Sequence, residues 1–311
     1  MAWFAGRLHK YQDVSTAAVL LVPEVKQPDY YLDPQGPTNT VPLHEDGWYV
    51  SSDSVKKIVN AHSPLGIPVI LVISVPDGND YGLHAITVVG HRQSGKAIAR
   101  RKNPNEIRWV AENIDQLYAH DDQWGPFARI NFLDDVGLKT PWTDGHGSAW
   151  PTRVTNIIVP VYPKVRISYE DIEAIVIGID TILSNFFFRG KIKNDLVWDI
   201  KIYFSESYKV KIKTEPISDE EKMRILIASL PKYIWVVNCY IGKIKILEAV
   251  FDATDVNNGM IGIELICYLA DDLRKILYQF LKKSMNRTIL KSDEAQRANL
   301  HYYDFLLAKL K

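Results

Sequence analysis

A series of short β-forming runs, separated by turn signals, recurs along the chain between residues 69 and 161. The runs span residues 69–74, 84–90, 109–110, 116–120, 127–132 and 154–161. Short strands at near-regular spacing are typical of a mainly antiparallel sheet. One helix precedes them, with Ser52 or Asp53 suited to cap it and with Val55, Ile58 and Val59 on one face. This pattern predicts an α+β fold with a helix and an antiparallel sheet.

The sequence after Pro163 has a different organisation, which predicts a second domain. At 311 residues the chain exceeds the size at which single cores stop growing, and we expect domains at residues 1–163 and 164–311. Ser168 with Asp171 has the spacing of a capping box. The predicted elements are a helix over 169–186, a hairpin of strands 196–204 and 208–213, a helix opening at Ser218, a hairpin of strands 233–240 and 243–251, and helices over 263–283 and 293–310.

Composition excludes several classes of function. The chain has 37 basic and 37 acidic residues, and no block of like charge breaks the balance, so binding to nucleic acid or to an anionic membrane has no electrostatic support. The basic run 100–102 is interpreted as a solvated loop. Two cysteines make neither a disulfide framework nor a zinc site. With no signal-peptide pattern and no apolar run of membrane-spanning length, we expect a cytoplasmic protein.

A histidine and two carboxylates stand at the ends of two predicted strands. His84 opens the run 84–90, and Asp121 and Asp122 close the run before a Gly-Pro turn signal. A base and its orienting carboxylate are usually presented in this way. The alternative is a buried histidine beside a solvated turn. A metal at His84, His91, His120 and these carboxylates is not predicted, because no spacing typical of metal ligands such as HExxH occurs.

The same stretch resembles papain-like peptidases, most closely the bacteriocin-leader-processing type and its bacterial relatives. The resemblance rests on Gly66-Ile67-Pro68-Val69, on the run from His84 to Gly90, and on Tyr118-Ala119-His120-Asp121. It covers residues 52–126 and implies a papain-like domain that is followed by an α+β accessory domain. It further implies that His84 is the general base and Asp121 its orienting carboxylate, with Asp122 as the alternative.

One part of the family's pattern is missing. The family places a nucleophilic cysteine before the histidine, with a glutamine that helps to form the oxyanion hole, but no cysteine precedes Cys239 here. The nearest substitutes are Gln12 and Ser15, and Cys239 itself would fit only a permuted order. We therefore expect a peptidase-like protein without its nucleophile, which binds a peptide or protein partner and needs no cofactor. The alternatives are an active hydrolase using Ser15, Cys239 or a cysteine from elsewhere, and a structural protein with a buried histidine–aspartate pair.

Overall fold

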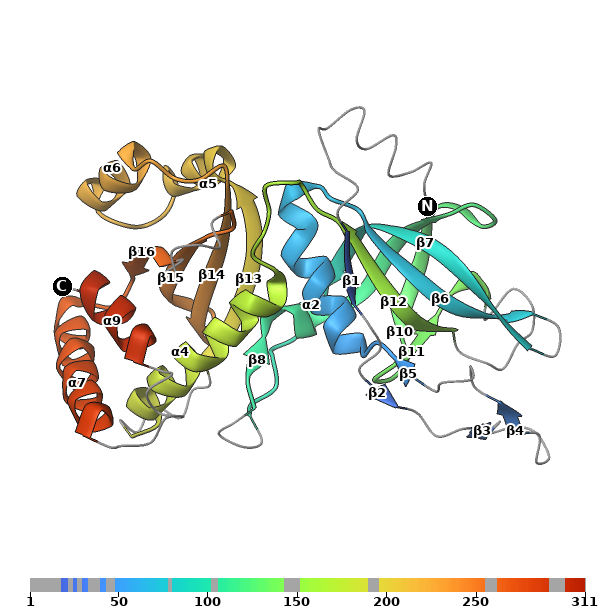
Figure 1. The fold of residues 1–311 in the computed structure, drawn as a ribbon, viewed down its shortest axis with the longest axis horizontal. Helices are drawn as coiled ribbons and strands as arrows, with labels where there is room; N and C mark the ends of the chain where they lie inside the picture. The colour runs from blue at the N-terminus through green and yellow to red at the C-terminus, as the bar shows by residue number, and fades with distance from the viewer. Residues whose placement is uncertain are drawn as a thin grey trace. The chain divides into compact units, whose positions relative to one another are not determined.

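The computed structural model describes residues 18–21, 25–26, 30–32, 40–42, 48–77, 80–101, 106–142, 152–189, 196–254, 262–290 and 300–310. The chain divides into two compact units, one made of residues 1–96 and 111–163 and the other of residues 97–110 and 164–311. Figure 1 shows the elements of each unit. The assignment of residues 1–163 and 164–311 to two domains stays a prediction. Gln12 and Ser15 lie outside the described residues.

The first unit is an antiparallel β-barrel with one helix. Six strands close on themselves in the order β12-β11-β10-β9-β7-β6, with β6 pairing back to β12, and β1 adds to β12. The strands are β1 (Ala18–Leu21), β6 (Val69–Asp77), β7 (Asp80–Gln93), β9 (Ile114–Asp121), β10 (Gly125–Phe132), β11 (Gly137–Lys139) and β12 (Thr152–Pro160). Two small pairs complete it, β2 (Val25–Lys26) with β5 (Trp48–Tyr49) and β3 (Tyr30–Leu32) with β4 (Thr40–Pro42).

Alternating side chains fill this barrel, as expected for a small closed sheet. Leu71 and Ile73 of β6, Leu117 of β9 and Leu138 of β11 are fully buried. Helix α2 (Ser52–His62) begins one residue earlier than predicted, because Ser51 is the N-cap: its Oγ accepts the backbone N–H of Ser54 at 3.1 Å. The short helix η1 (Ser63–Leu65) follows α2.

The second unit is a mixed five-stranded sheet with helices on both faces. Its strand order is β16-β15-β14-β13-β8, with β8 parallel to β13 and the other pairs antiparallel. The strands are β8 (Arg108–Trp109), β13 (Leu196–Phe204), β14 (Tyr233–Ile241), β15 (Ile244–Asp252) and β16 (Gly262–Cys267); the short helix η2 (Val110–Asn113) follows β8. The helices are α4 (Tyr169–Arg189), α5 (Ser205–Ile212), α6 (Asp219–Ile227), α7 (Asp271–Leu290) and α9 (Leu300–Lys309).

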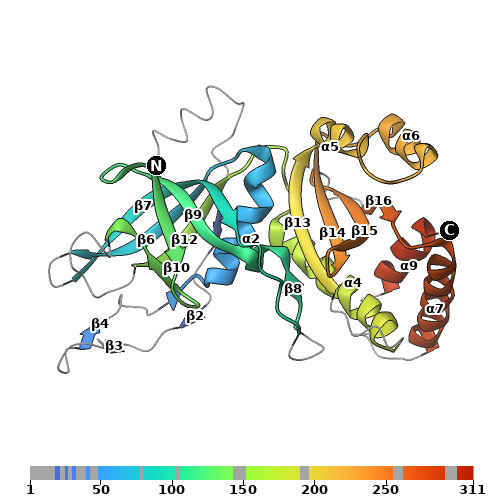
Figure 2. The same cartoon turned by 180° about the vertical axis from the view of Figure 1, so that it is seen from behind.

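Neighbouring residues of β14 show which helices cover which face of this sheet. Ile234 and Val236 pack in one core with residues of α5 and α6. Trp235, which points to the opposite face, contacts Tyr169 at the start of α4. On that same second face Phe251 meets Phe305 of α9. Figure 2 shows α5 and α6 apart from α4, α7 and α9.

The sequence predicted the class of this unit correctly but placed two elements wrongly. The α+β class and the hairpin of β14 and β15 are confirmed, as are the caps at Ser168 and Ser218. The predicted strand over 208–213 is wrong, because Tyr208 and Ile212 lie four residues apart on helix α5 and both point into the core. The predicted helix over 263–283 is also wrong at its start, since residues 262–267 form edge strand β16.

The prediction of a solvated loop at residues 100–102 is wrong at Arg101. Its side chain is only 2% exposed and pairs with Asp180 of α4, which is 3% exposed. Two hydrogen bonds of 2.7 and 2.6 Å join the guanidinium to both carboxylate oxygens. Trp198 also donates its Nε1–H to Oδ1 of Asp180 at 2.6 Å. Arg101 is therefore a core residue of the second unit, held by a bidentate ion pair.

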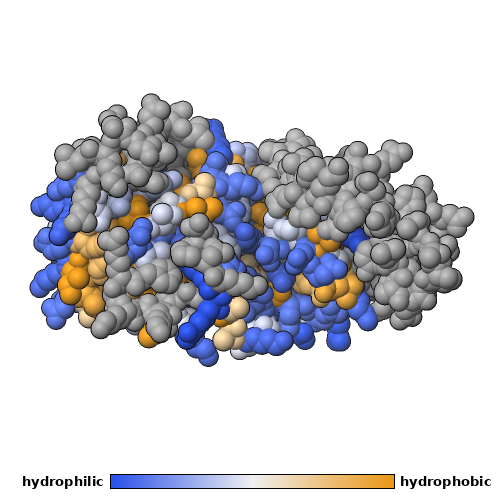
Figure 3. Space-filling view, turned by 90° about the horizontal axis from the view of Figure 1, so that it is seen from below, coloured by the Kyte–Doolittle hydropathy of each residue, from blue (hydrophilic) through white to orange (hydrophobic). Residues whose placement is uncertain are grey.

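The described surface is mixed in character. Figure 3 shows hydrophilic residues interspersed with several hydrophobic patches on one face. Among the described residues, no helix combines the length and the apolar composition that crossing a membrane requires.

Candidate functional site

The barrel of the first unit brings His84 and Asp121 together, although His84 lies within β7, which begins at Asp80, and not at the predicted strand start. His84 lies on β7, and Asp121 is the last residue of β9, the antiparallel neighbour of β7. Thr87 pairs with His120, so Asp121 lies one step further along, diagonally across from His84. Side chains in such diagonal positions on one face of a sheet are within reach of each other. The pairing of two adjacent strands thus sets the geometry of the site.

The imidazole of His84 contacts both predicted carboxylates through one nitrogen. Its Nε2 is 3.2 Å from Oδ2 of Asp121 and 3.5 Å from Oδ1 of Asp122. The side chains of His84 and Asp121 are 14% and 4% exposed, whereas that of Asp122 is 81% exposed. Asp121 is therefore the buried partner that can orient the ring, and Asp122 lies at the solvent edge of the site.

Asp121 is held firmly in place. Its Oδ1 accepts the backbone N–H groups of Gln123 at 2.8 Å and Trp124 at 3.0 Å, and its Oδ2 accepts the indole N–H of Trp142 at 3.1 Å. Burial raises the pKa of Asp121, but these three hydrogen bonds and the nearby His84 lower it by more, so the pKa lies below its usual range. The group is a carboxylate at neutral pH.

Two tryptophan rings lie beside this pair. The ring of Trp142 lies 5.1 Å from that of His84, and Trp124 meets Trp142 edge-on at 6.1 Å. Phe127 packs edge-on against His120 at 4.9 Å, while most of its side chain is exposed. Its φ of 59° is unusual for a bulky residue. Of the exposed apolar residues nearby, Trp124 adjoins the ring that contacts His84, whereas Leu83, next to His84 on β7, points to the opposite face of the sheet.

Two other residues considered from the sequence, Cys239 as a nucleophile and His91 as a metal ligand, are poorly placed for these roles. Cys239 lies on β14 of the second unit and is fully buried. Burial raises the pKa of its thiol well above the usual range, with a further increase from Asp180 and an opposing effect of Arg101. A buried thiol that resists ionisation is a poor nucleophile. His91 lies further along β7, where it pairs with Leu117 rather than with the carboxylates.

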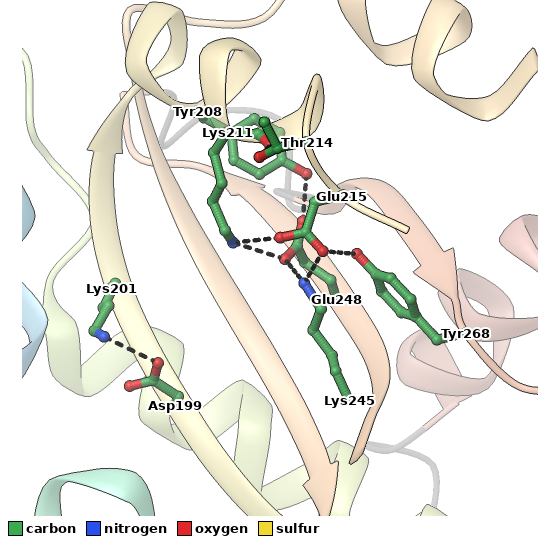
Figure 4. Close-up of polar contacts among 9 residues, drawn as sticks. All are labelled: Asp199, Lys201, Tyr208, Lys211, Thr214, Glu215, Lys245, Glu248 and Tyr268. Carbon is green, nitrogen blue, oxygen red and sulfur yellow. Dashed lines mark hydrogen bonds and ion pairs between the residues drawn. The ribbon is translucent and has the colours of Figure 1, made fainter. Parts of the chain in front are cut away.

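A second polar group, which no sequence motif predicted, lies within the second unit. Figure 4 shows Lys211 and Lys245 pointing at the carboxylates of Glu215 and Glu248. Lys245 Nζ is 2.6 Å from Glu215 and 3.0 Å from Glu248, and Lys211 Nζ is 3.0 Å from Glu248. Tyr208 and Tyr268 donate their hydroxyl hydrogens to Glu248 and Glu215 respectively. We call these six residues the Glu215–Glu248 cluster.

This cluster is balanced in charge and in hydrogen bonds. Two carboxylates face two ammonium groups, and each carboxylate also accepts a hydrogen bond from a tyrosine. Burial raises the pKa of Tyr208 far above its usual range, and Glu248 adds to the effect, so the hydroxyl stays a donor. A saturated network of this kind fixes the segment after α5 to the sheet, which is a packing role.

Comparison of the chain with family models, with curated proteins and with solved structures gives no match. The function must therefore be inferred from the geometry alone.

Proposed function

We propose that this protein is a papain-like, peptidase-related module that binds a peptide or protein segment at the His84–Asp121 pair, without a nucleophile of its own. The observation that carries the proposal is the fixed Asp121, held by three donors, beside a partly exposed His84.

The arrangement of elements supports the papain-like part of the proposal. Helix α2 is followed by β6, His84 lies on the next strand, and Asp121 ends the strand beside it. The family pattern implies this order of helix, histidine and aspartate on an antiparallel sheet.

The chemistry of the imidazole supports the binding part. While the ring is neutral, the ionised Asp121 favours the tautomer with its proton on Nε2. Nδ1 is then an acceptor, and among the described residues no hydrogen bond to it is found. A main-chain N–H of an extended peptide is a suitable donor, and the exposed Trp124 offers contact to an apolar side chain.

A peptide library screen tests this proposal. Extended peptides with one apolar residue should quench or shift the fluorescence of the tryptophans at the site, and His84→Ala should weaken that binding by roughly tenfold, the value of one lost hydrogen bond to a charged or polarised group. The exposed Asp53→Asn is a control that should bind as the parent does. Equal binding by the parent and by His84→Ala would contradict the proposal.

A second measurement separates the module from an active hydrolase. The protein is treated with an electrophilic trap for thiols and hydroxyls, and labelled peptides are mapped by mass spectrometry. We expect no label that depends on His84. A label on one residue, for instance Ser15, that disappears in His84→Ala would identify a histidine-activated nucleophile and replace our proposal with an enzyme.

A further inference from the structure

Two carboxylates converge on one nitrogen of His84. Its Nε2 lies 3.2 Å from Oδ2 of Asp121 and 3.5 Å from Oδ1 of Asp122, and the three atoms all lie within 4.8 Å of one another. Nε2 carries at most one proton, which points at one acceptor. Asp121 takes that proton in the pair described above, so the position of Asp122 is not explained by it.

We propose that His84, Asp121 and Asp122 bind one divalent transition-metal ion, and that zinc fits best. Imidazole nitrogen and carboxylate oxygen are both zinc ligands, at about 2.0–2.2 Å from the ion. Two ligand atoms of a tetrahedral zinc are then roughly 3.3 Å apart. The separations of 3.2 and 3.5 Å around Nε2 are close to this value. Because Asp122 is exposed, its side chain can turn to complete the geometry.

The surroundings of Asp121 suit a metal ligand. Ligating carboxylates are typically held by hydrogen bonds from further groups, which fix their orientation. Oδ1 of Asp121 accepts two backbone N–H groups, and the indole N–H of Trp142 reaches Oδ2 at 3.1 Å. A carboxylate oxygen has two lone pairs, so Oδ2 can accept this bond and bind a metal at once.

The number of protein ligands indicates whether the ion would keep an open coordination position. Three protein ligands leave a further position of a tetrahedral zinc open to water or to a bound group. The site is open to solvent on the side of Asp122. Magnesium should bind far more weakly, because it prefers oxygen ligands to imidazole. This inference goes beyond the proposed function and does not depend on peptide binding.

Isothermal titration of the metal-free full chain with zinc chloride tests the proposal. The parent should bind one zinc ion in a step that Asp122→Asn weakens by roughly tenfold or more, since a direct ligand is lost. Asp122 is exposed, so this variant should fold, which circular dichroism checks. Asp135→Asn, another exposed aspartate in the same unit, is the matched control and should bind zinc as the parent does. Titration with magnesium chloride should show no comparable step.

The chain has eight histidines, so zinc bound elsewhere must be distinguished. The step assigned to this site should also disappear in His84→Ala. A parent that binds no zinc, or a zinc step that is equally strong in Asp122→Asn or in His84→Ala, would overturn the metal site. Loss of zinc binding in these variants, together with no peptide binding by the parent, would leave the metal site standing and contradict only the proposed function.

Discussion

His62 makes the stability of the barrel unit sensitive to mild acid. It ends helix α2 in a fully buried position, where its Nδ1 lies 2.9 Å from the carbonyl oxygen of Ile58. A carbonyl oxygen only accepts, so Nδ1 carries the proton of the neutral ring. Burial lowers the pKa of His62 from 6.5 to about 4, against a smaller opposing effect of the bond to Ile58.

The sign and size of the effect follow from proton linkage. Between pH 6.5 and about 4 the unfolded chain binds a proton at this histidine and the folded chain does not, so the free energy of unfolding decreases as the pH falls. The stability is fully present above pH 6.5 and is lost progressively toward pH 4. Integrated from pH 8 to pH 5 with these two pKa values, the loss is about 2 kcal/mol.

Urea unfolding of the parent and of His62→Gln at pH 8 and pH 5 measures this loss. Hydrogen exchange of peptides that span α2 reports the first unit separately from the second. The decrease between the two pH values should be smaller by about 2 kcal/mol in His62→Gln than in the parent. Removal of an exposed histidine in His120→Gln should leave the decrease unchanged. The same pH dependence in parent and His62→Gln would refute the reasoning.

Two further predictions concern the second unit. A Cβ at Gly178 of α4 would lie 2.2 Å from Cε2 of Tyr302, so Gly178→Ala should destabilise the unit by about 1–3 kcal/mol, and an unchanged melting temperature would contradict this close approach. Arg101→Met leaves Asp180 buried without its cation and should cost about 3–5 kcal/mol in urea unfolding. The double variant Arg101→Met with Asp180→Leu should recover part of that loss, and no recovery would mean that the cost lies in packing rather than charge.

Local signals in the sequence were enough to predict many elements but not the closure of the barrel. Ser168 and Ser218 cap helices as predicted, because a capping box lies within four residues. Closure depends on β12 pairing with β6, which joins Arg153 to Ser74 across most of the unit. No short-range pattern specifies such a partner, since any exposed strand edge offers the same hydrogen-bonding groups.

The two misplaced elements are short apolar segments whose periodicity suits two structures. In the run after Phe204, Tyr208 and Ile212 match an alternating strand as well as one face of a helix. Residues 262–267 carry enough apolar side chains to extend the stripe of α7, and only their pairing with β15 makes them a strand. Tertiary contacts decide such cases.

The sequence was enough to predict the histidine and the aspartate of the candidate site, but not the residues that hold the aspartate in place. The position of Asp121 at a strand end was predicted correctly, and His84 was predicted on the right strand, although β7 begins at Asp80 and His84 lies within it. Trp142 follows Asp121 by 21 residues with no motif between them, yet its indole N–H fixes the carboxylate. The ion pair of Arg101 and the Glu215–Glu248 cluster could not be predicted either, since their side chains are far apart in the sequence and meet only in the folded unit.

Peptide binding and metal binding require different protonation states of Nε2 of His84, so experiments can distinguish them. In the peptide-binding pair Nε2 of His84 holds a proton directed at Asp121, whereas a metal needs the lone pair of the same atom. Asp122 matters only to the metal, because its carboxylate adds nothing to the orientation of the ring that the better-held Asp121 does not supply. If both proposals hold, zinc should alter peptide binding in the parent protein and should have a weaker effect in Asp122→Asn.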